Sequence, residues 1–183
     1  MLLAPITFRS KNGKEFILRS PCDEEAQICL DMMVKIATHS PYILTTSEDF
    51  QKKTLEGQVT WFQESAASDS SILITVFHQQ QMIGFCNGRS YKDVKRKHRA
   101  ALGITLLPDF RGCGLGMKMM EVLIESMKKF SNIKIIELDV MTNNIPAMKM
   151  YEKLGFKSAG IFPNAFILPT GEVSDNMTMY LEV

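Results

Sequence analysis

The sequence predicts a single α/β domain in which helices flank one mixed β-sheet. Its 183 residues correspond to about one domain of ordinary size, and 45% hydrophobic residues are enough for a buried core. Strand-like and helix-like segments alternate along the chain. No repeat, low-complexity tract or linker rich in Pro, Gly and Ser divides them. We therefore expect one domain over residues 1–183.

The first part of the chain predicts a hairpin followed by helices. Asn12-Gly13 between two apolar segments is a strong signal for a hairpin turn. Asp23 can cap a helix, and Pro41 enforces a break after it. The expected segments are hairpin strands at Phe8–Arg9 and Phe16–Arg19, a helix from Asp23 to about Thr38, and a helical region from Ser47 to about Ser65.

The second part predicts strands that alternate with two helices. Pro108 ends one strand, Gly155 ends the shorter helix, and apolar residues at helical spacing mark the longer one. The expected segments are strands at Ser71–Phe77, Met82–Tyr91 and Ala100–Leu107, a helix at Gly114–Phe130, a strand at Ile133–Val140, a helix at Asn144–Leu154 and two closing strands.

Charge and cysteine usage exclude several classes of function. Lys plus Arg is 21 and Asp plus Glu is 20, and a net charge of +1 argues against nucleic acid or an anionic membrane as the main partner. No apolar run approaches about 18 residues, and the first nine residues do not resemble a secretory signal. The four cysteines and three histidines lack the spacing of a metal site. We expect a cytoplasmic protein with free thiols.

A basic turn at Tyr91–Arg99 allows two interpretations. Its five Lys and Arg residues could attract an acidic partner or a phosphate. Such runs more often form a solvated hairpin tip, and this one has no interleaved aromatic residues on which bases could stack.

The most informative segment is a strand that runs through a glycine-rich turn into a helix. After Ile104–Pro108 the turn reads Asp109-Phe110-Arg111-Gly112-Cys113-Gly114-Leu115-Gly116. The first N–H groups of a helix have no intrahelical partner and lie at the positive end of its dipole. Glycine lets these groups approach a phosphate closely. The segment therefore predicts a ligand with a phosphate or pyrophosphate group.

Two familiar phosphate-binding motifs fail on spacing. A Walker A loop needs Gly-Lys-Ser/Thr, whereas Gly116 is followed by Met117-Lys118-Met119. A dinucleotide fingerprint needs a third glycine where Met117 stands. Asp139 has the place of a ribose-binding acid, but its strand comes late in the chain rather than in an opening βαβ unit.

Two blocks instead resemble the GNAT superfamily of N-acetyltransferases. Arg111–Gly116 matches that family's pyrophosphate loop, R/Q-x-x-G-x-G/A. The second block is similar to the family's strand followed by N-x-x-A-x-x-x-Y-x-x-x-G-F, and here it consists of Leu138-Asp139-Val140, Asn144, Ala147, Tyr151, Gly155 and Phe156. A looser match at Gly171, Asp175 and Met179 resembles the closing hairpin of the branch that includes ribosomal-protein and polyamine acetyltransferases.

The resemblance implies a mixed, mostly antiparallel central sheet whose strands splay apart at an acetyl-CoA site. The acetyl-CoA core would cover about residues 100–160, with acetyl-CoA as cosubstrate and no metal. Unpaired backbone groups of Leu106 and Leu107 would bind the pantetheine arm, which Asn144 would steady. The pyrophosphate would be held by N–H groups of Arg111, Gly112, Cys113, Gly114, Leu115, Gly116 and Met117.

Acetyl transfer needs a neutral amine, a donor for the carbonyl oxygen and a proton for the leaving thiolate. The resemblance places Tyr151 near the sulfur as general acid, and the Leu106 N–H is the expected oxyanion donor. Asp139 stands where relatives that acetylate ribosomal-protein N-termini often carry a glutamate base; it is shorter, so a bridging water could be needed. The alternatives are that Asp139 only faces solvent, that Glu48, Asp49 or Glu56 lines the substrate side, or that water is the base.

Two other residues, His98 and Cys113, are poorly suited to a catalytic role. His98 precedes Leu106 by eight residues, or about 26 Å along an extended strand. A covalent role for Cys113 is disfavoured, because its position is variable in the family and contributes a backbone N–H.

The expected function is direct transfer of an acetyl group from acetyl-CoA to a primary amine, such as a peptide N-terminus, a polyamine or another small amine. The alternative is a non-catalytic module that binds acyl-CoA as a sensor or partner. We expect no nucleic-acid or membrane partner. A homodimer is compatible with the fold, because exposed edge strands of such sheets often pair.

Overall fold

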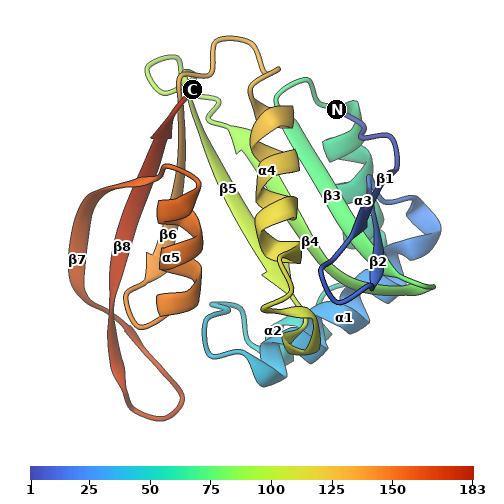
Figure 1. Cartoon of the computed structure of the whole chain (residues 1–183), viewed down its shortest axis with the longest axis horizontal. Helices are drawn as coiled ribbons and strands as arrows, with labels where there is room; N and C mark the ends of the chain where they lie inside the picture. Colours follow the sequence, from blue (N-terminus) through green and yellow to red (C-terminus); the bar gives the residue numbers. More distant parts are fainter.

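A sheet of eight strands forms the centre of the computed structural model, which describes residues 1–183 (Figure 1). The order of the strands is β1-β2-β3-β4-β5-β6-β8-β7, and every neighbouring pair is antiparallel except β5 and β6. The strands are β1 (Ile6–Arg9), β2 (Glu15–Arg19), β3 (Ser71–His78), β4 (Gln81–Ser90), β5 (Arg99–Leu106), β6 (Ile135–Met141), β7 (Lys157–Ile167) and β8 (Val173–Glu182). The predicted mixed, mostly antiparallel sheet is confirmed.

Helices cover both faces of this sheet. Two of them, α4 and α5, pack on one face, and α1 and α3 pack on the opposite face (Figure 1). The helices are α1 (Ala26–His39), α2 (Ser47–Gln51), α3 (Leu55–Ala67), α4 (Leu115–Met127) and α5 (Ile145–Lys153), with 3₁₀ turns η1 (Asp23–Glu25) and η2 (Pro108–Phe110). No helix is both long enough and apolar enough to cross a membrane.

The expected N-terminal hairpin is confirmed, and two helix boundaries differ from the expectation. The hairpin turns at Gly13, whose φ of 81° favours glycine. The first α-helix begins at Ala26, because Asp23 lies in the preceding 3₁₀ turn. The helical region expected from Ser47 to Ser65 is two helices, because the Thr54 side chain accepts a hydrogen bond from the Gly57 N–H and starts a new one.

Close packing fixes the glycine-rich turn against the sheet. Met119, Leu123 and Met127 of α4 are fully buried on the sheet. A Cβ atom on Gly88 of β4 would overlap the Met127 side chain, so glycine allows α4 to approach the strand this closely. The start of α4 is therefore held at the end of β5, where the turn leaves the sheet.

The sheet splits between its only parallel strands. Pairing of β5 with β6 is confined to Arg99–Ala101 against Ile135–Glu137. Beyond these residues β5 is paired only with β4, and β6 only with β8. The two strands therefore diverge toward their C-terminal ends, as the resemblance implied.

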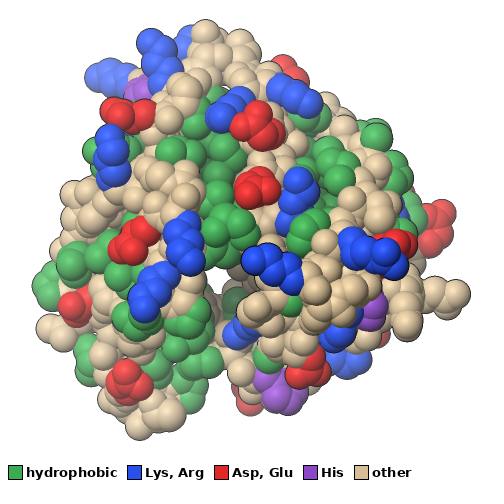
Figure 2. All heavy atoms as spheres, viewed as in Figure 1, with side chains coloured by type: hydrophobic (Ala, Val, Ile, Leu, Met, Phe, Trp, Pro, Cys, Tyr) green, Lys and Arg blue, Asp and Glu red, His purple; other side chains and the backbone are tan.

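The split is visible on the surface of the molecule. Figure 2 shows an opening in the lower half of the view, between α5 and the N-terminal end of α4 as Figure 1 places them, with Lys and Arg side chains around it. The hairpin of β7 and β8 extends beside it, and β7 forms an outer edge of the sheet that is almost entirely exposed.

Candidate active site

Backbone groups of both diverging strands face the split. The Leu107 N–H donates to the Ile83 carbonyl at 2.9 Å, and N–H groups alternate in direction along a strand, so those of Ile104 and Leu106 point toward β6. On the other arm, the Thr142 N–H donates to the Asp175 carbonyl at 3.0 Å, so the backbone of Asp139 faces β5. The split thus offers two strand edges to an extended ligand.

This geometry corrects one expected ligand group. The Leu107 N–H is not unpaired, because it completes the β4–β5 ladder at Ile83. The Leu106 N–H is the one that faces the split. The Leu106 N–H, which is the expected oxyanion donor, points into the split, whereas Leu107 supplies no free N–H.

The glycine-rich turn presents a continuous series of free N–H groups. No backbone N–H from Gly112 to Met117 donates to an acceptor within the chain. Gly112 and Gly114 have φ values of 73° and 87°, and a Cβ atom on either would meet nothing within 4 Å. These N–H groups surround the N-terminus of α4, where the helix dipole also favours an anion. The turn therefore has unpaired donors of the kind that the predicted phosphate site needs.

Arg111 braces this turn against the end of β5. Its Nε and one terminal nitrogen donate to the Leu106 carbonyl at 3.0 and 2.9 Å. Burial lowers the pKa of the Arg111 guanidinium, while the nearby Tyr42 acts in the opposite direction. The N–H group of Arg111 is itself bonded to the Pro108 carbonyl, so Arg111 contributes its side chain rather than a free backbone donor.

Asp139 lies on the arm of the split opposite β5. Its neighbours Leu138 and Val140 are buried toward α4 and α5, so the exposed Asp139 side chain points to the other face of the sheet. Its Oδ1 accepts hydrogen bonds from Asn176 at 2.9 Å and from the Thr178 hydroxyl at 2.6 Å. Its Oδ2 has no hydrogen bond within the chain, so one oxygen remains for an incoming proton donor.

Tyr151 is buried on α5, with its ring 5.9 Å from that of Phe156. Burial raises the pKa of the Tyr151 hydroxyl to about 12, and no partner within the chain bonds to that hydroxyl. A phenol in this state is protonated at neutral pH and free to donate. Asn144 precedes the helix rather than sharing its face, and its Oδ1 accepts from the Ala147 N–H at 3.4 Å as the N-cap.

Sequence reasoning missed the segment that crosses the mouth of the split. The Tyr42 hydroxyl, between α1 and α2, donates to the Asn143 carbonyl, just before α5, at 3.4 Å. The Asn143 side chain in turn bonds to Ser174 at 3.1 Å and to Glu172 at 3.0 Å. No local signal could reveal this connection, because the partners lie about 100 residues apart in the sequence.

Other residues weighed as candidates lie elsewhere or are already engaged. His98 stands at the opposite end of β5, in the basic turn, where Arg96 pairs with Asp93 and Arg99 with Glu137. The Cys113 thiol donates to the Phe110 carbonyl at 3.2 Å. Asp49 bonds to Thr46 and Lys52, while Glu48 and Glu56 are exposed.

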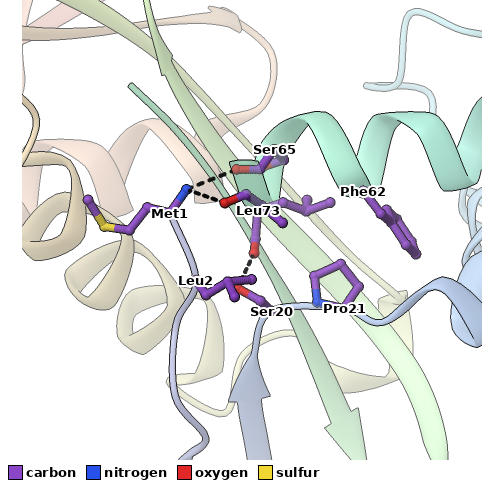
Figure 3. Close-up of a pocket in the computed structure, with 8 residues that line it drawn as sticks. Met1, Leu2, Ser20, Pro21, Phe62, Ser65 and Leu73 are labelled. Carbon is purple, nitrogen blue, oxygen red and sulfur yellow. Dashed lines mark hydrogen bonds between the residues drawn. The ribbon is translucent and has the colours of Figure 1, made fainter. Parts of the chain in front are cut away.

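A separate hollow lies beside α3, away from the split. Figure 3 shows Met1 beside Ser65 at this hollow. The Met1 ammonium donates to the Ser65 and Ala66 carbonyls at 2.9 and 3.3 Å. The Ser20 hydroxyl donates to the Leu73 carbonyl at 3.2 Å beneath it. None of the residues around this hollow belongs to the glycine-rich turn, β5 or β6.

The fold and the site together offer an extended, phosphorylated ligand a place between two diverging strands. Residues 31–156 match the model of the acetyltransferase (GNAT) family. An N-alpha-acetyltransferase of Saccharolobus solfataricus is 27% identical over 150 residues, which cover 81% of this chain and 84% of the relative. The chain spans about half the length of the next curated relatives it matches.

Solved structures share the fold. A GNAT-family acetyltransferase from Streptococcus pneumoniae superposes with a TM-score of 0.86 at 20% identity, over 92% of this chain and 99% of the other. An acetyltransferase from Salmonella typhimurium, solved with its cofactor acetyl-CoA, gives a TM-score of 0.78 at 14% identity, over 91% and 93%. The chain belongs to the GNAT acetyltransferase family. It is an acyltransferase by class.

Proposed function

We propose that this protein transfers the acetyl group of acetyl-CoA directly to a primary amine. The observation that carries the proposal is the series of free N–H groups from Gly112 to Met117, placed where the open edge of β5 ends. A pyrophosphate fits these donors, and an amide-containing arm fits the strand edges that lead away from them. The acetyl-CoA in the Salmonella typhimurium neighbour supports the same ligand here.

The residues of the split supply what the transfer needs. The Leu106 N–H donates to the thioester oxygen as charge develops on it. The Asp139 carboxylate, directly or through a water, accepts the proton that the attacking amine loses. The amine nitrogen bonds to the acetyl carbon, the carbon–sulfur bond breaks, and the Tyr151 hydroxyl protonates the leaving thiolate. Asn144 retains its side-chain NH₂ group to hold the pantetheine arm.

A thermal-shift titration tests the choice of ligand. Acetyl-CoA at about 100 times its Kd should stabilise the protein by about 2.7 kcal/mol, and coenzyme A should act similarly. ATP and NAD at the same concentration should give no comparable shift. Stabilisation by ATP or NAD alone, or by none of the four, would contradict the proposed ligand.

Release of free thiol tests catalysis. Purified protein with acetyl-CoA should release coenzyme A only when an acceptor amine is present, because transfer is direct. The panel should contain peptide N-termini, free amino acids and polyamines. Tight binding of acetyl-CoA without turnover of any of these amines would favour the non-catalytic module.

A further inference from the structure

Two side chains of β8 donate hydrogen bonds to the same oxygen of Asp139. Asp139 of β6 is paired with Thr178 of β8, and Asn176 shares the face of Thr178 because it is two residues away on the strand. The Thr178 hydroxyl and the Asn176 side chain bond to Asp139 Oδ1 at 2.6 and 2.9 Å. A carboxylate can only accept, so Asn176 contributes its NH₂ group to this contact. Both donors therefore hold Oδ1, and neither holds Oδ2.

The orientation of the Asn176 amide has a cost for the fold. With its NH₂ group toward Asp139, its side-chain oxygen is the only buried side-chain oxygen or nitrogen of the chain that has no hydrogen-bond partner. Asn176 is paired with Met141 on one side and Phe162 on the other, and neither side chain can donate to that oxygen. A buried acceptor without a donor lowers the stability of the folded state. Stability alone therefore does not explain an asparagine at this position.

Asp139 does not need either donor to satisfy its own hydrogen-bonding capacity. Its side chain is exposed, so water can bond to both of its oxygens. The two donors instead give the carboxylate a fixed direction. Rotation about the Cβ–Cγ bond would exchange Oδ1 and Oδ2, and this rotation would break both hydrogen bonds at once. The contacts with β8 thus determine which oxygen of Asp139 stays free.

We propose that Thr178 and Asn176 are positioning residues that hold Asp139 for proton transfer. This inference rests on the proposed function, in which the attacking amine loses its proton to Asp139. With Oδ1 bonded twice, Oδ2 is the oxygen that accepts this proton, and it keeps one direction as the amine approaches. A general base is effective only when it lies within hydrogen-bond reach of the proton that it removes. The two β8 residues act through Asp139 and do not need to touch the amine.

Two substitutions of Thr178 separate the effect of its hydroxyl from that of its shape. Thr178→Val removes the hydroxyl and should lower kcat about tenfold in the thiol-release assay with the most active amine of the panel, because a hydrogen bond to a charged group is lost. The KM for acetyl-CoA should change by less than about twofold, since the cosubstrate is expected at the turn and the β5 edge. Thr178→Ser keeps the hydroxyl and should retain most of the wild-type kcat. Thr7→Val, at an exposed position of β1, is the matched control and should leave kcat unchanged.

Asn176→Leu should change stability and activity in opposite directions. The substitution removes the donor to Asp139 together with the unpartnered buried oxygen, and leucine has a similar size. The melting temperature should therefore equal or exceed that of the wild type, while kcat falls by about fivefold to tenfold. An asparagine with a purely structural role would give the reverse result, which is a lower melting temperature and an unchanged kcat.

A double-mutant cycle tests whether Thr178 acts through Asp139. In the Asp139→Asn background the carboxylate is absent, so its orientation no longer contributes to the rate. Adding Thr178→Val to that background should lower the residual kcat by less than about twofold, compared with about tenfold in the wild-type background. Melting curves of each variant establish that it is folded.

The outcomes separate this inference from the proposed function. A folded Thr178→Val variant with the wild-type kcat would overturn the positioning role and leave acetyl transfer intact. The same would follow if Thr178→Val lowered kcat equally in both backgrounds, or if Thr178→Ser lost as much activity as Thr178→Val. No turnover by the wild-type protein with any amine of the panel would contradict acetyl transfer, and with it the positioning role.

Discussion

The Arg111 guanidinium holds the Leu106 carbonyl with two of its nitrogens, at 3.0 and 2.9 Å. The bond ties the glycine-rich turn to the end of the strand from which the turn departs. Leu106 therefore presents only its N–H group to the split, while its carbonyl is already satisfied. The turn and the proposed oxyanion donor are positioned by the same contact.

Replacing Arg111 should weaken acetyl-CoA binding without abolishing the fold. Arg111→Ala removes both hydrogen bonds to Leu106, and loss of hydrogen bonds from a charged group predicts a KM for acetyl-CoA that is about tenfold higher. Arg111→Lys should recover only part of the affinity for acetyl-CoA, because a single ammonium group cannot reproduce the two hydrogen bonds of the guanidinium. Steady-state thiol release measures both variants, and equal KM values for all three proteins would contradict the bracing role.

Gly114→Ala tests the conformation of the turn. At a φ of 87° an alanine lowers the free energy of unfolding by about 1–2 kcal/mol. The variant should therefore have a lower melting temperature and bind acetyl-CoA more weakly. Gly160→Ala is the control, because a Cβ atom there meets nothing within 4 Å and φ is not left-handed. If the two variants gave the same binding constant, the turn geometry would not matter for the ligand.

Tyr151→Phe should lower kcat by about 10²-fold and leave the affinity for acetyl-CoA nearly unchanged, because only the proton donor is lost. The fold should tolerate the change, since the hydroxyl has no hydrogen-bond partner in the chain. Tyr180→Phe, on β8, is the matched control and should retain the wild-type kcat. Equal kcat values for Tyr151→Phe and wild type would remove Tyr151 from the mechanism.

The same tyrosine predicts an alkaline loss of stability. Burial raises its pKa to about 12 in the folded state, against about 10 when unfolded, so the folded protein retains this proton longer. The free energy of unfolding should be unaffected by this group below pH 10 and should fall between about pH 10 and 12. Urea titrations at pH 10 and pH 12 measure this fall in the free energy of unfolding. The fall should be smaller in Tyr151→Phe than in the wild type by about 1–3 kcal/mol. A fall of equal size in both proteins would contradict the effect of burial.

Asp139→Asn should lower kcat/KM by about 10²-fold at neutral pH, because the amide cannot accept the proton of the amine. The substitution keeps the size of the side chain, so the melting temperature should change little. Asp139→Glu should retain more activity, because it keeps the carboxylate. If the pH profile of Asp139→Asn matched that of the wild type, water or another group would be the base.

The parts of the molecule that the sequence predicts are those with local signals. Asn12-Gly13 predicts a hairpin turn from two neighbouring residues. Gly112 and Gly114 likewise predict a helix N-terminus with free N–H groups, and neither signal depends on residues distant in the sequence. The direction of the Leu107 N–H depends on how β5 pairs with β4 at Ile83. The sequence of β5 alone does not reveal which of its N–H groups face β4. The sequence does not predict the separation of α2 from α3, because residues 47–65 are otherwise compatible with one helix. The Thr54 N-cap starts a second helix within them.

Long-range contacts account for the other omissions. Tyr42 and Asn143 meet only because the α1–α2 segment and the start of α5 lie at one end of the sheet. The partners of Asp139 come from β8, which the chain reaches only at its end. Neither set of contacts follows from a sequence motif of fixed spacing. These contacts on the acceptor side of the site can therefore be seen only in the folded structure.

The split gives the sheet two edge strands in its interior, in addition to β1 and β7 at its outer limits. Main-chain amides such as that of Ile104 are thus open to solvent exchange although they lie near the centre of the sheet, and such edges are also templates on which another chain can aggregate. A ligand that pairs along them should slow deuterium uptake at Ile104 and suppress self-association. If acetyl-CoA is that ligand, its binding should therefore also protect the protein from aggregation.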